Sequence, residues 1–163
     1  MRIGLVVSQF NTEITGRLLD SALTVLAADE RIKIGPIVRV PGSFEIPFAA
    51  KMMARGEPSV DAVICLGVIL QGGTDQNTHL ARACAIGLQW AQLETGVPMT
   101  FGLISAPSVE VAMDRTRGEL DRGREAALAA IEMAELKLKR RMKTDYKDLT
   151  AEVARSEAFF SPS

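Results

Sequence analysis

The chain has a single histidine and only two cysteines among its 163 residues, so few side chains are available for metal binding or for redox chemistry. Cys65 and Cys84 form no C-x-x-C pair and no histidine adjoins either, so the sequence favours neither a metal site nor a redox motif. Cys65 lies in an apolar strand pattern and Cys84 in a helical pattern. We therefore expect two buried thiols in a reducing compartment and no bound metal.

The chain also has no excess of charge of either sign. Its 19 Lys and Arg residues stand against 20 Asp and Glu residues, for a formal net charge of −1. A bulk electrostatic attraction to nucleic acid or to an anionic membrane is therefore excluded. No apolar run is long enough to span a bilayer, and the sequence opens on a strand pattern rather than on a signal peptide. We expect a cytoplasmic protein with no nucleic-acid or membrane partner.

What the chain does contain is a regular alternation of strand and helix patterns. Residues 61–70 are apolar almost throughout, whereas residues 13–28 carry apolar side chains at helical spacing. Apolar strands separated by helices are typical of a parallel sheet covered on both faces. The sequence therefore predicts an α/β fold, a three-layer α/β/α sandwich with a central four-stranded parallel sheet. The predicted strands are residues 2–8, 34–40, 61–70 and 98–105, and the predicted helices are about residues 13–28, 44–55, 76–95, 108–117 and 121–142.

We expect one domain over residues 1–142, followed by a polar tail, residues 143–163, that is partly disordered. In parallel sheets, ligands bind beyond the carboxyl ends of the strands. The loops that follow the four predicted strands should therefore gather on one rim. These loops are residues 8–12, 41–45, 70–76 and 105–108.

The most informative loop joins the third strand to its helix through Gly72, Gly73 and Thr74. A glycine-rich turn before a helix leaves backbone N–H groups available and directs the positive end of the helix dipole at one point, which favours an anion such as phosphate. The spacing matches neither the dinucleotide-binding motif nor the P-loop. A tight connection that binds nothing is the alternative interpretation.

Three further features of the rim have both a structural and a functional interpretation. Phe10 can stack on a planar heterocycle, or it can pack as a hydrophobic staple on the helix that follows. Glu45 can bind a polyol, or it can only stabilise the start of its helix through the dipole or a bond to the N-cap. Arg115, Arg117 and Arg122 are solvated by default, yet a neighbouring anion site would recruit one or two of them.

Taken in order, these segments resemble the lumazine synthases, the enzymes of the penultimate step of riboflavin synthesis. The most specific match is V-P-G-S-F-E-I-P over residues 40–47. Phe10-Asn11 followed by Ile14-Thr15 is similar to the family's R-F-N-x-x-I-T, with Gln9 in place of the arginine. L-G-V-I-L-Q-G-G-T over residues 66–74 and E-T-G-V-P-M-T-F-G over residues 94–102 parallel two further family motifs. The resemblance covers residues 2–135 and implies a flavodoxin-like fold.

The resemblance implies a transferase that uses no metal and no organic cofactor. Such an enzyme condenses 5-amino-6-(D-ribitylamino)uracil with 3,4-dihydroxy-2-butanone 4-phosphate, releases phosphate and water, and forms 6,7-dimethyl-8-ribityllumazine. The match implies that an aromatic ring stacks on the pyrimidine and that another aromatic covers the site from an adjacent subunit. The implied substrate-binding residues are Phe10, Asn11, Ser43, Phe44, Glu45, Val68, Ile69, Leu70 and Phe101, and the implied phosphate-binding residues are Gly73, Thr74, Arg115 and Arg122.

The chain departs from the family pattern at two places. The family's proton-transferring histidine is replaced by Gln76, whose amide cannot exchange a proton near neutral pH. The only histidine, His79, follows three residues later, on nearly the same face of the predicted helix. His79 is thus a candidate substitute, and a surface or interface histidine without a role is the alternative. The segment of residues 117–122 is one residue shorter than is typical, so its register against the family is open.

The resemblance also implies self-association. Family members form homopentamers, and some assemble twelve pentamers into an icosahedral 60-mer. This chain starts at the first core strand, without the extension that pairs with a neighbour in many shell-forming members, so we expect a free pentamer with the shell as the alternative.

Two other functions stay open: a pentameric lumazine- or flavin-binding scaffold that lost catalysis with its histidine, and a lumazine-dismutating enzyme like the archaeal riboflavin synthases of this fold. The basic run of residues 137–143 is expected to be a solvated helix end rather than a site for RNA or an acidic partner.

Overall fold

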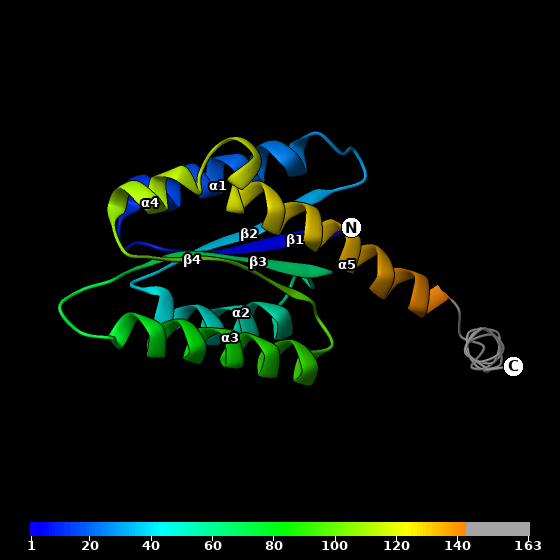
Figure 1. The fold of residues 1–163 in the computed structure, drawn as a ribbon. Helices are drawn as coiled ribbons and strands as arrows, with labels where there is room; N and C mark the ends of the chain where they lie inside the picture. The colour runs from blue at the N-terminus through cyan, green and yellow to red at the C-terminus, as the bar shows by residue number, and fades with distance from the viewer. Residues whose placement is uncertain (143–163) are drawn as a thin grey trace, which may run out of the picture.

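A computed structural model describes residues 1–142, and the tail predicted over residues 143–163 lies outside the described residues. Four parallel strands form one sheet in the order β2-β1-β3-β4. The helices lie in two layers, with α2 and α3 on one face of the sheet and α1, α4 and α5 on the other (Figure 1). The predicted three-layer α/β/α sandwich with a four-stranded parallel sheet is therefore confirmed.

The observed elements lie close to the predicted ones. The strands are β1 (Arg2–Ser8), β2 (Lys33–Val40), β3 (Ala62–Leu70) and β4 (Met99–Ala106). The α-helices are α1 (Thr12–Ala27), α2 (Ile46–Arg55), α3 (Gln76–Thr95), α4 (Val109–Asp114) and α5 (Arg122–Met142), and two 3₁₀ turns are η1 (Ser43–Glu45) and η2 (Gly118–Leu120).

Alternate residues of the central strands face two separate apolar cores. On one face, Leu5 and Ile64 pack with α1 and with the alanines of α5. On the other face, Val6 and Cys65 pack with α2 and α3. Both faces of β3 are thus buried, which is why its sequence is apolar without alternation.

Helix α5 packs very closely on α1, and its sequence explains how. A Cβ atom added at Gly123 would lie 2.3 Å from the backbone oxygen of Leu18, so only glycine fits there. Four further small side chains of α5 are buried in the apolar core that α5 shares with α1 and the sheet: Ala126, Ala127, Ala130 and Ala134. Close helix packing of this kind holds the start of α5, with Arg122, in a fixed position against the sheet.

Three helix starts and ends have local features that the residue ranges alone do not show. Asn11 is the N-cap residue of α1, but its side chain makes no capping bond and its backbone adopts left-handed angles, φ 55° and ψ 59°. Its carbonyl oxygen instead accepts from the N–H groups of Ile14 and Thr15. The helix predicted from residue 44 begins with the 3₁₀ turn η1, because Pro47 has no N–H to give to an α-helical bond. The helix predicted over residues 108–117 is shorter, since it ends at Asp114.

The loops that follow the four strands gather at one end of the sheet, on the left of Figure 1, whereas the second half of α5 lies at the opposite end. Cys65 and Cys84 are buried free thiols, as predicted. Among residues 1–142, no helix has the length and apolarity that a membrane crossing requires.

Candidate functional site

A cavity of about 370 Å³ opens at the rim, beyond the ends of β1 and β3. Its size falls within the range of small-molecule sites. Two phenylalanine rings border it, Phe10 at 59% exposure and Phe44 at 65% exposure. Most of the Phe10 side chain faces solvent, which leaves its ring accessible for stacking. The residues that line the cavity are Phe10, Pro41, Gly42, Ser43, Phe44, Glu45, Val68, Ile69, Leu70 and Leu80.

Backbone hydrogen bonds fix the two loops that carry the aromatic rings. The N–H of Gln9 donates to the carbonyl of Val40 at 2.7 Å, and the N–H of Phe10 donates to the carbonyl of Pro41 at 3.2 Å. These bonds continue the parallel pairing of β1 with β2 beyond the end of the sheet. The Phe10 backbone is thereby held beside the turn that carries Phe44.

The floor of the cavity depends on a close approach of η1 to β3. The Ser43 hydroxyl donates to the carbonyl of Val68 at 3.2 Å, and both residues are buried. A Cβ atom at Gly67 would lie 2.7 Å from the Ser43 Oγ and 2.9 Å from the Ile46 Cδ1. Glycine at this position is therefore what lets the V-P-G-S-F-E segment lie directly on the strand.

Glu45 makes the structural contact that its position in the first helical turn suggested. Its Oε2 accepts from the N–H of Gly42 at 2.9 Å, which holds the Pro41-Gly42 turn against η1. The same half-buried carboxylate lines the cavity. Since a carboxylate has two oxygens, one can hold the turn while the other meets a ligand hydroxyl.

Cys84 lies beneath this turn and is not a nucleophile. Its thiol donates to the carbonyl of Ser43 at 3.2 Å. Burial, with a smaller contribution from the Glu45 carboxylate, raises the pKa of the Cys84 thiol to about 11. The neutral thiol is therefore a structural hydrogen-bond donor near neutral pH.

The glycine turn after β3 leaves the start of α3 open to solvent. Gly72 and Gly73 are exposed, and a Cβ atom at either would meet no atom within 4 Å. The Oγ1 of Thr74 accepts from the N–H of Gln76, the first residue of α3, at 3.4 Å. Neither glycine has a positive φ, so what they provide is access to the backbone rather than an unusual turn.

His79 lies beside Asp75, a residue that the sequence analysis did not identify as part of the site. His79 Nε2 lies 3.2 Å from the Asp75 Oδ2, and both side chains are largely exposed. Gln76 begins α3, so Gln76 and His79 are one turn apart on the helix, as the prediction required. The spacing of four residues between Asp75 and His79 could have signalled this pair. Leu80, which lines the cavity, was missed as well, although it lies four residues after Gln76.

Two of the three arginines line a second, smaller cavity. Arg115 and Arg122 border a space of about 120 Å³ together with residues of β4. The N–H of Arg122 donates to the carbonyl of Arg115 at 2.8 Å, which closes the loop between α4 and α5, and the Arg122 guanidinium pairs with Glu125 at 2.8 Å. Arg117 instead pairs with Asp114, away from this cavity.

The structure therefore does not unite all the predicted residues in one cavity of one chain. Arg115 and Arg122 share no cavity with Phe10 or Glu45. Phe101 lies on β4, the edge strand, with 40% of its side chain exposed, and it lines neither cavity. Asn11 lies next to Phe10 without lining the cavity, and its buried side-chain nitrogen has no hydrogen-bond partner. The buried hydroxyl of Ser8, at the end of β1, is likewise without a partner.

Comparison with known proteins identifies the relatives of the chain. The family described as 6,7-dimethyl-8-ribityllumazine synthase matches residues 1–138. A 6,7-dimethyl-8-ribityllumazine synthase of Protochlamydia amoebophila is 43% identical over 141 residues, which cover 83% of this chain and 79% of the relative. Proteins of the same name from Halorhodospira halophila and Syntrophus aciditrophicus are each 38% identical over 83% of this chain, and the matches cover 87% and 89% of those relatives. The chain belongs to the 6,7-dimethyl-8-ribityllumazine synthase family.

Proposed function

We propose that this protein is a 6,7-dimethyl-8-ribityllumazine synthase of riboflavin biosynthesis. It condenses 5-amino-6-(D-ribitylamino)uracil with 3,4-dihydroxy-2-butanone 4-phosphate and releases phosphate and water. The observation that carries this proposal is the rim cavity, which combines exposed aromatic rings, a carboxylate and strand-end backbone beside an open helix N-terminus. Family membership supports the same reaction.

The cavity offers a complementary group for each part of the ribitylaminouracil. The exposed Phe10 ring stacks on the planar pyrimidine. Backbone N–H and C=O groups of Val68, Ile69 and Leu70 bind the polar edge of the uracil. The second oxygen of Glu45 accepts a hydroxyl of the ribityl chain, while its first oxygen keeps the bond to Gly42.

The phosphate of the second substrate binds at the start of α3. Gly73 and Thr74 present backbone N–H groups there, and the helix dipole adds a positive potential. Arg115 and Arg122 supply the counter-charge. Because they line another cavity within one chain, we propose that they reach this phosphate from a neighbouring copy.

Catalysis then consists largely of positioning. The cavity holds the amine of one substrate against the carbonyl of the other, and effective concentrations of this kind lower a barrier by several kcal/mol. Phosphate leaves into a site that already carries positive charge. His79, next to Asp75, is the group that can move a proton, while Gln76 orients water or a carbonyl oxygen.

A homopentamer would provide the neighbouring copy that the proposed shared site requires. Phe101 on the edge strand β4 is exposed, so it can cover the cavity of an adjacent subunit. Helix α3 also exposes an apolar stripe at helical spacing, with Ile86 at 60%, Trp90 at 72% and Leu93 at 81%. A stripe of this size indicates a protein interface. We favour a free cytoplasmic pentamer, and the 60-mer is the alternative.

The decisive experiment incubates the purified protein with both substrates and follows lumazine absorbance. Product formation that depends on both substrates, together with stoichiometric phosphate release, is the expected result. The scaffold alternative predicts binding of lumazine without turnover. Conversion of lumazine to riboflavin, without the two substrates, would instead indicate the dismutating enzyme.

A further inference from the structure

The smaller cavity, which we call the arginine cavity, is lined by two arginines that a largely exposed loop connects. Arg115 directly follows α4 and Arg122 begins α5, and residues 117–120 between them are all exposed. The N–H of Arg122 donates to the carbonyl of Arg115 at 2.8 Å, so the two backbones are tied together. Whatever holds the start of α5 therefore also sets where both arginine side chains leave the backbone.

Asp121, the residue just before α5, holds this start with its side chain. Only 8% of Asp121 is exposed. Its Oδ1 accepts from the N–H of Arg124 at 3.1 Å, which caps the first turn of α5. Its Oδ2 accepts from the hydroxyl of Ser21, a residue of α1, at 2.6 Å. One carboxylate thus uses both oxygens, one to begin α5 and the other to attach it to α1.

The bond between Asp121 and Ser21 lies beside a very close contact of the same two helices. Gly123 follows Asp121 by two residues, and a Cβ atom there would lie 2.3 Å from the backbone oxygen of Leu18. Leu18 precedes Ser21 by about one turn of α1. Helices α1 and α5 lie together on one face of the sheet (Figure 1). The first turn of α5 is therefore held against α1 by packing on one side and by the Asp121 carboxylate on the other.

We propose that Asp121 is a positioning residue for the phosphate of the second substrate. It does not line the arginine cavity and so acts through other residues. These are Arg122, in the first turn of α5, and Arg115, which the backbone bond ties to Arg122. This inference rests on the proposed function, in which the two arginines bind that phosphate. Misplacement of a positioned group by about 1 Å can cost about 10²-fold in rate, so a lost anchor should be measurable.

The variant Asp121→Ala removes both side-chain bonds and tests the proposal on the full-length protein. It should raise the dissociation constant of inorganic phosphate and the KM of the butanone phosphate about tenfold. The KM of the ribitylaminouracil should not change, because that substrate occupies the rim cavity. Calorimetry measures phosphate binding, and lumazine absorbance gives the two KM values.

The variant Asp121→Asn separates position from charge. The amide oxygen can accept from the N–H of Arg124, and the amide N–H₂ can donate to the oxygen of Ser21, so both contacts are kept. Positioning therefore predicts nearly wild-type phosphate binding in this variant. A carboxylate that acted only as a charge would repel phosphate, and both variants would then bind phosphate more tightly than the wild type.

The variant Ser21→Ala removes one of the two side-chain bonds and leaves the cap of α5 in place. It should weaken phosphate binding by less than Asp121→Ala does. If Asp121→Ala does not fold, Ser21→Ala provides the test, and phosphate binding equal to that of the wild type would then contradict the proposal.

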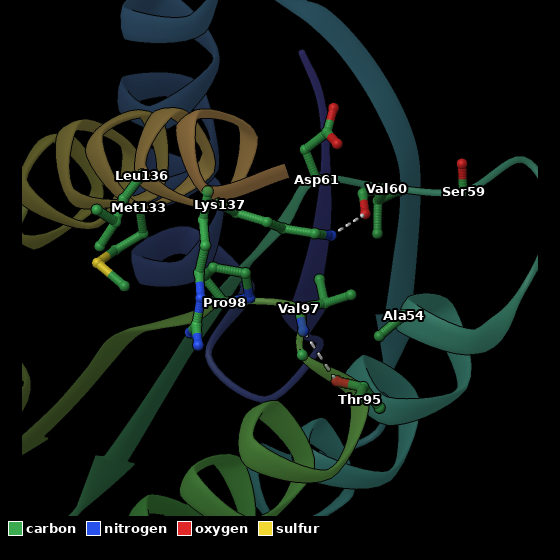
Figure 2. Close-up of a pocket in the computed structure, with 12 residues that line it drawn as sticks. Ala54, Ser59, Val60, Asp61, Thr95, Val97, Pro98, Met133, Leu136 and Lys137 are labelled. Carbon is green, nitrogen blue, oxygen red and sulfur yellow. Dashed lines mark hydrogen bonds between the residues drawn. The ribbon is translucent and has the colours of Figure 1, made fainter. Parts of the chain in front are cut away.

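The far end of α5 provides a control for stability. Beside a cavity of about 640 Å³ at that end of the sheet, Lys137 Nζ donates to the Val60 carbonyl at 3.3 Å, so this end has an anchor of its own (Figure 2). Ala134, one turn of the helix before it, is fully buried. Ala134→Gly should lower the melting temperature, because glycine disfavours a helix and leaves a gap in the core. It should leave phosphate binding unchanged.

Three outcomes would overturn the proposal: a folded Asp121→Ala protein that binds phosphate as the wild type does, an equal loss in Asp121→Asn, and an equal loss in Ala134→Gly. The proposed function fails separately. A wild type that binds phosphate through Arg115 but forms no lumazine would contradict the proposed function alone. Lumazine formation with phosphate binding that depends on Arg115 but not on Asp121 would contradict this inference alone.

Discussion

The two cavities at the carboxyl ends of the strands are built for different parts of a reaction. The rim cavity is bordered by aromatic rings and backbone, and the hydrogen bonds of Ser43 and Glu45 hold its shape within one chain. The arginine cavity is about a third of that volume and carries two guanidinium groups beside the edge strand β4. The first suits a planar heterocycle with a polyol chain, whereas the second suits an anion. This difference is the basis of our proposal that one chain holds the ring-binding half of the site and a neighbouring copy supplies the arginines.

The largest expected effect comes from dissociating the oligomer, which separates the ring-binding half of the proposed site from the arginines. Dilution below the dissociation range of the oligomer should abolish activity, because no monomer then contains both the ring-binding residues and the arginines of a neighbour. Activity per chain measured against concentration, beside sedimentation velocity, provides the test. A stable and fully active monomer would contradict the shared site, whereas a particle near sixty subunits would contradict only the preference for a free pentamer.

Removal of one arginine should weaken the binding of the phosphorylated substrate and leave the binding of the other substrate unchanged. Arg115→Ala should weaken its binding by about 1.5–3 kcal/mol, the range for hydrogen bonds to charged groups. A ribitylaminouracil analogue should bind as before, since it occupies the other half of the site. Arg117→Ala is the matched control, because Arg117 pairs with Asp114 and lines neither cavity. An equal loss for both ligands, measured by calorimetry, would contradict the division.

The shape of the ring-binding half can be changed without touching the phosphate half. Gly67→Ala would bring a methyl group to 2.7 Å from Ser43 Oγ. Overpacking of this kind should lower the free energy of unfolding by about 1–3 kcal/mol and weaken the uracil analogue. Gly72→Ala, where a Cβ atom meets nothing within 4 Å, is the control and should be nearly neutral. Urea unfolding and analogue titration measure both effects, and equal stability of the two variants would contradict the close approach of η1 to β3.

The smallest expected effect concerns proton transfer. His79→Gln should lower turnover about tenfold, near the low end for general acid–base catalysis because positioning carries most of the rate. The pH–rate profile should become flatter, because the variant lacks the imidazole that exchanges the proton. Substrate affinities should hardly change. Gln76→His should raise the rate, because it restores the family's proton-transferring group. Unchanged turnover and pH dependence in His79→Gln would leave positioning alone as the mechanism.

Much of the ring-binding half could be predicted from the sequence because it is local. Residues 40–47 carry five of the residues that line the cavity beside Phe10, and the strand-end residues 68–70 follow from the position of β3. The predictions that were wrong concern the ends of two helices. The helix predicted from residue 44 begins with the 3₁₀ turn η1, and the helix predicted over residues 108–117 ends at Asp114, because the bonds available in the packed loops decide where a helix begins and ends.

The sequence by itself determined the layers, the order of elements and the family, because apolar periodicity and short motifs act over neighbouring residues. Only the tertiary structure decided which of those residues meet. It joined Arg115 to Arg122 through a backbone bond, set Arg117 apart with Asp114, and kept both cavity arginines out of the rim cavity. It also formed a cavity of about 640 Å³ from the last turns of α5 and the segments that lead into β3 and β4, which lie far apart in the chain. The physical reason is that a cavity is the space left between packed elements, so its position depends on how they pack and not on any one segment.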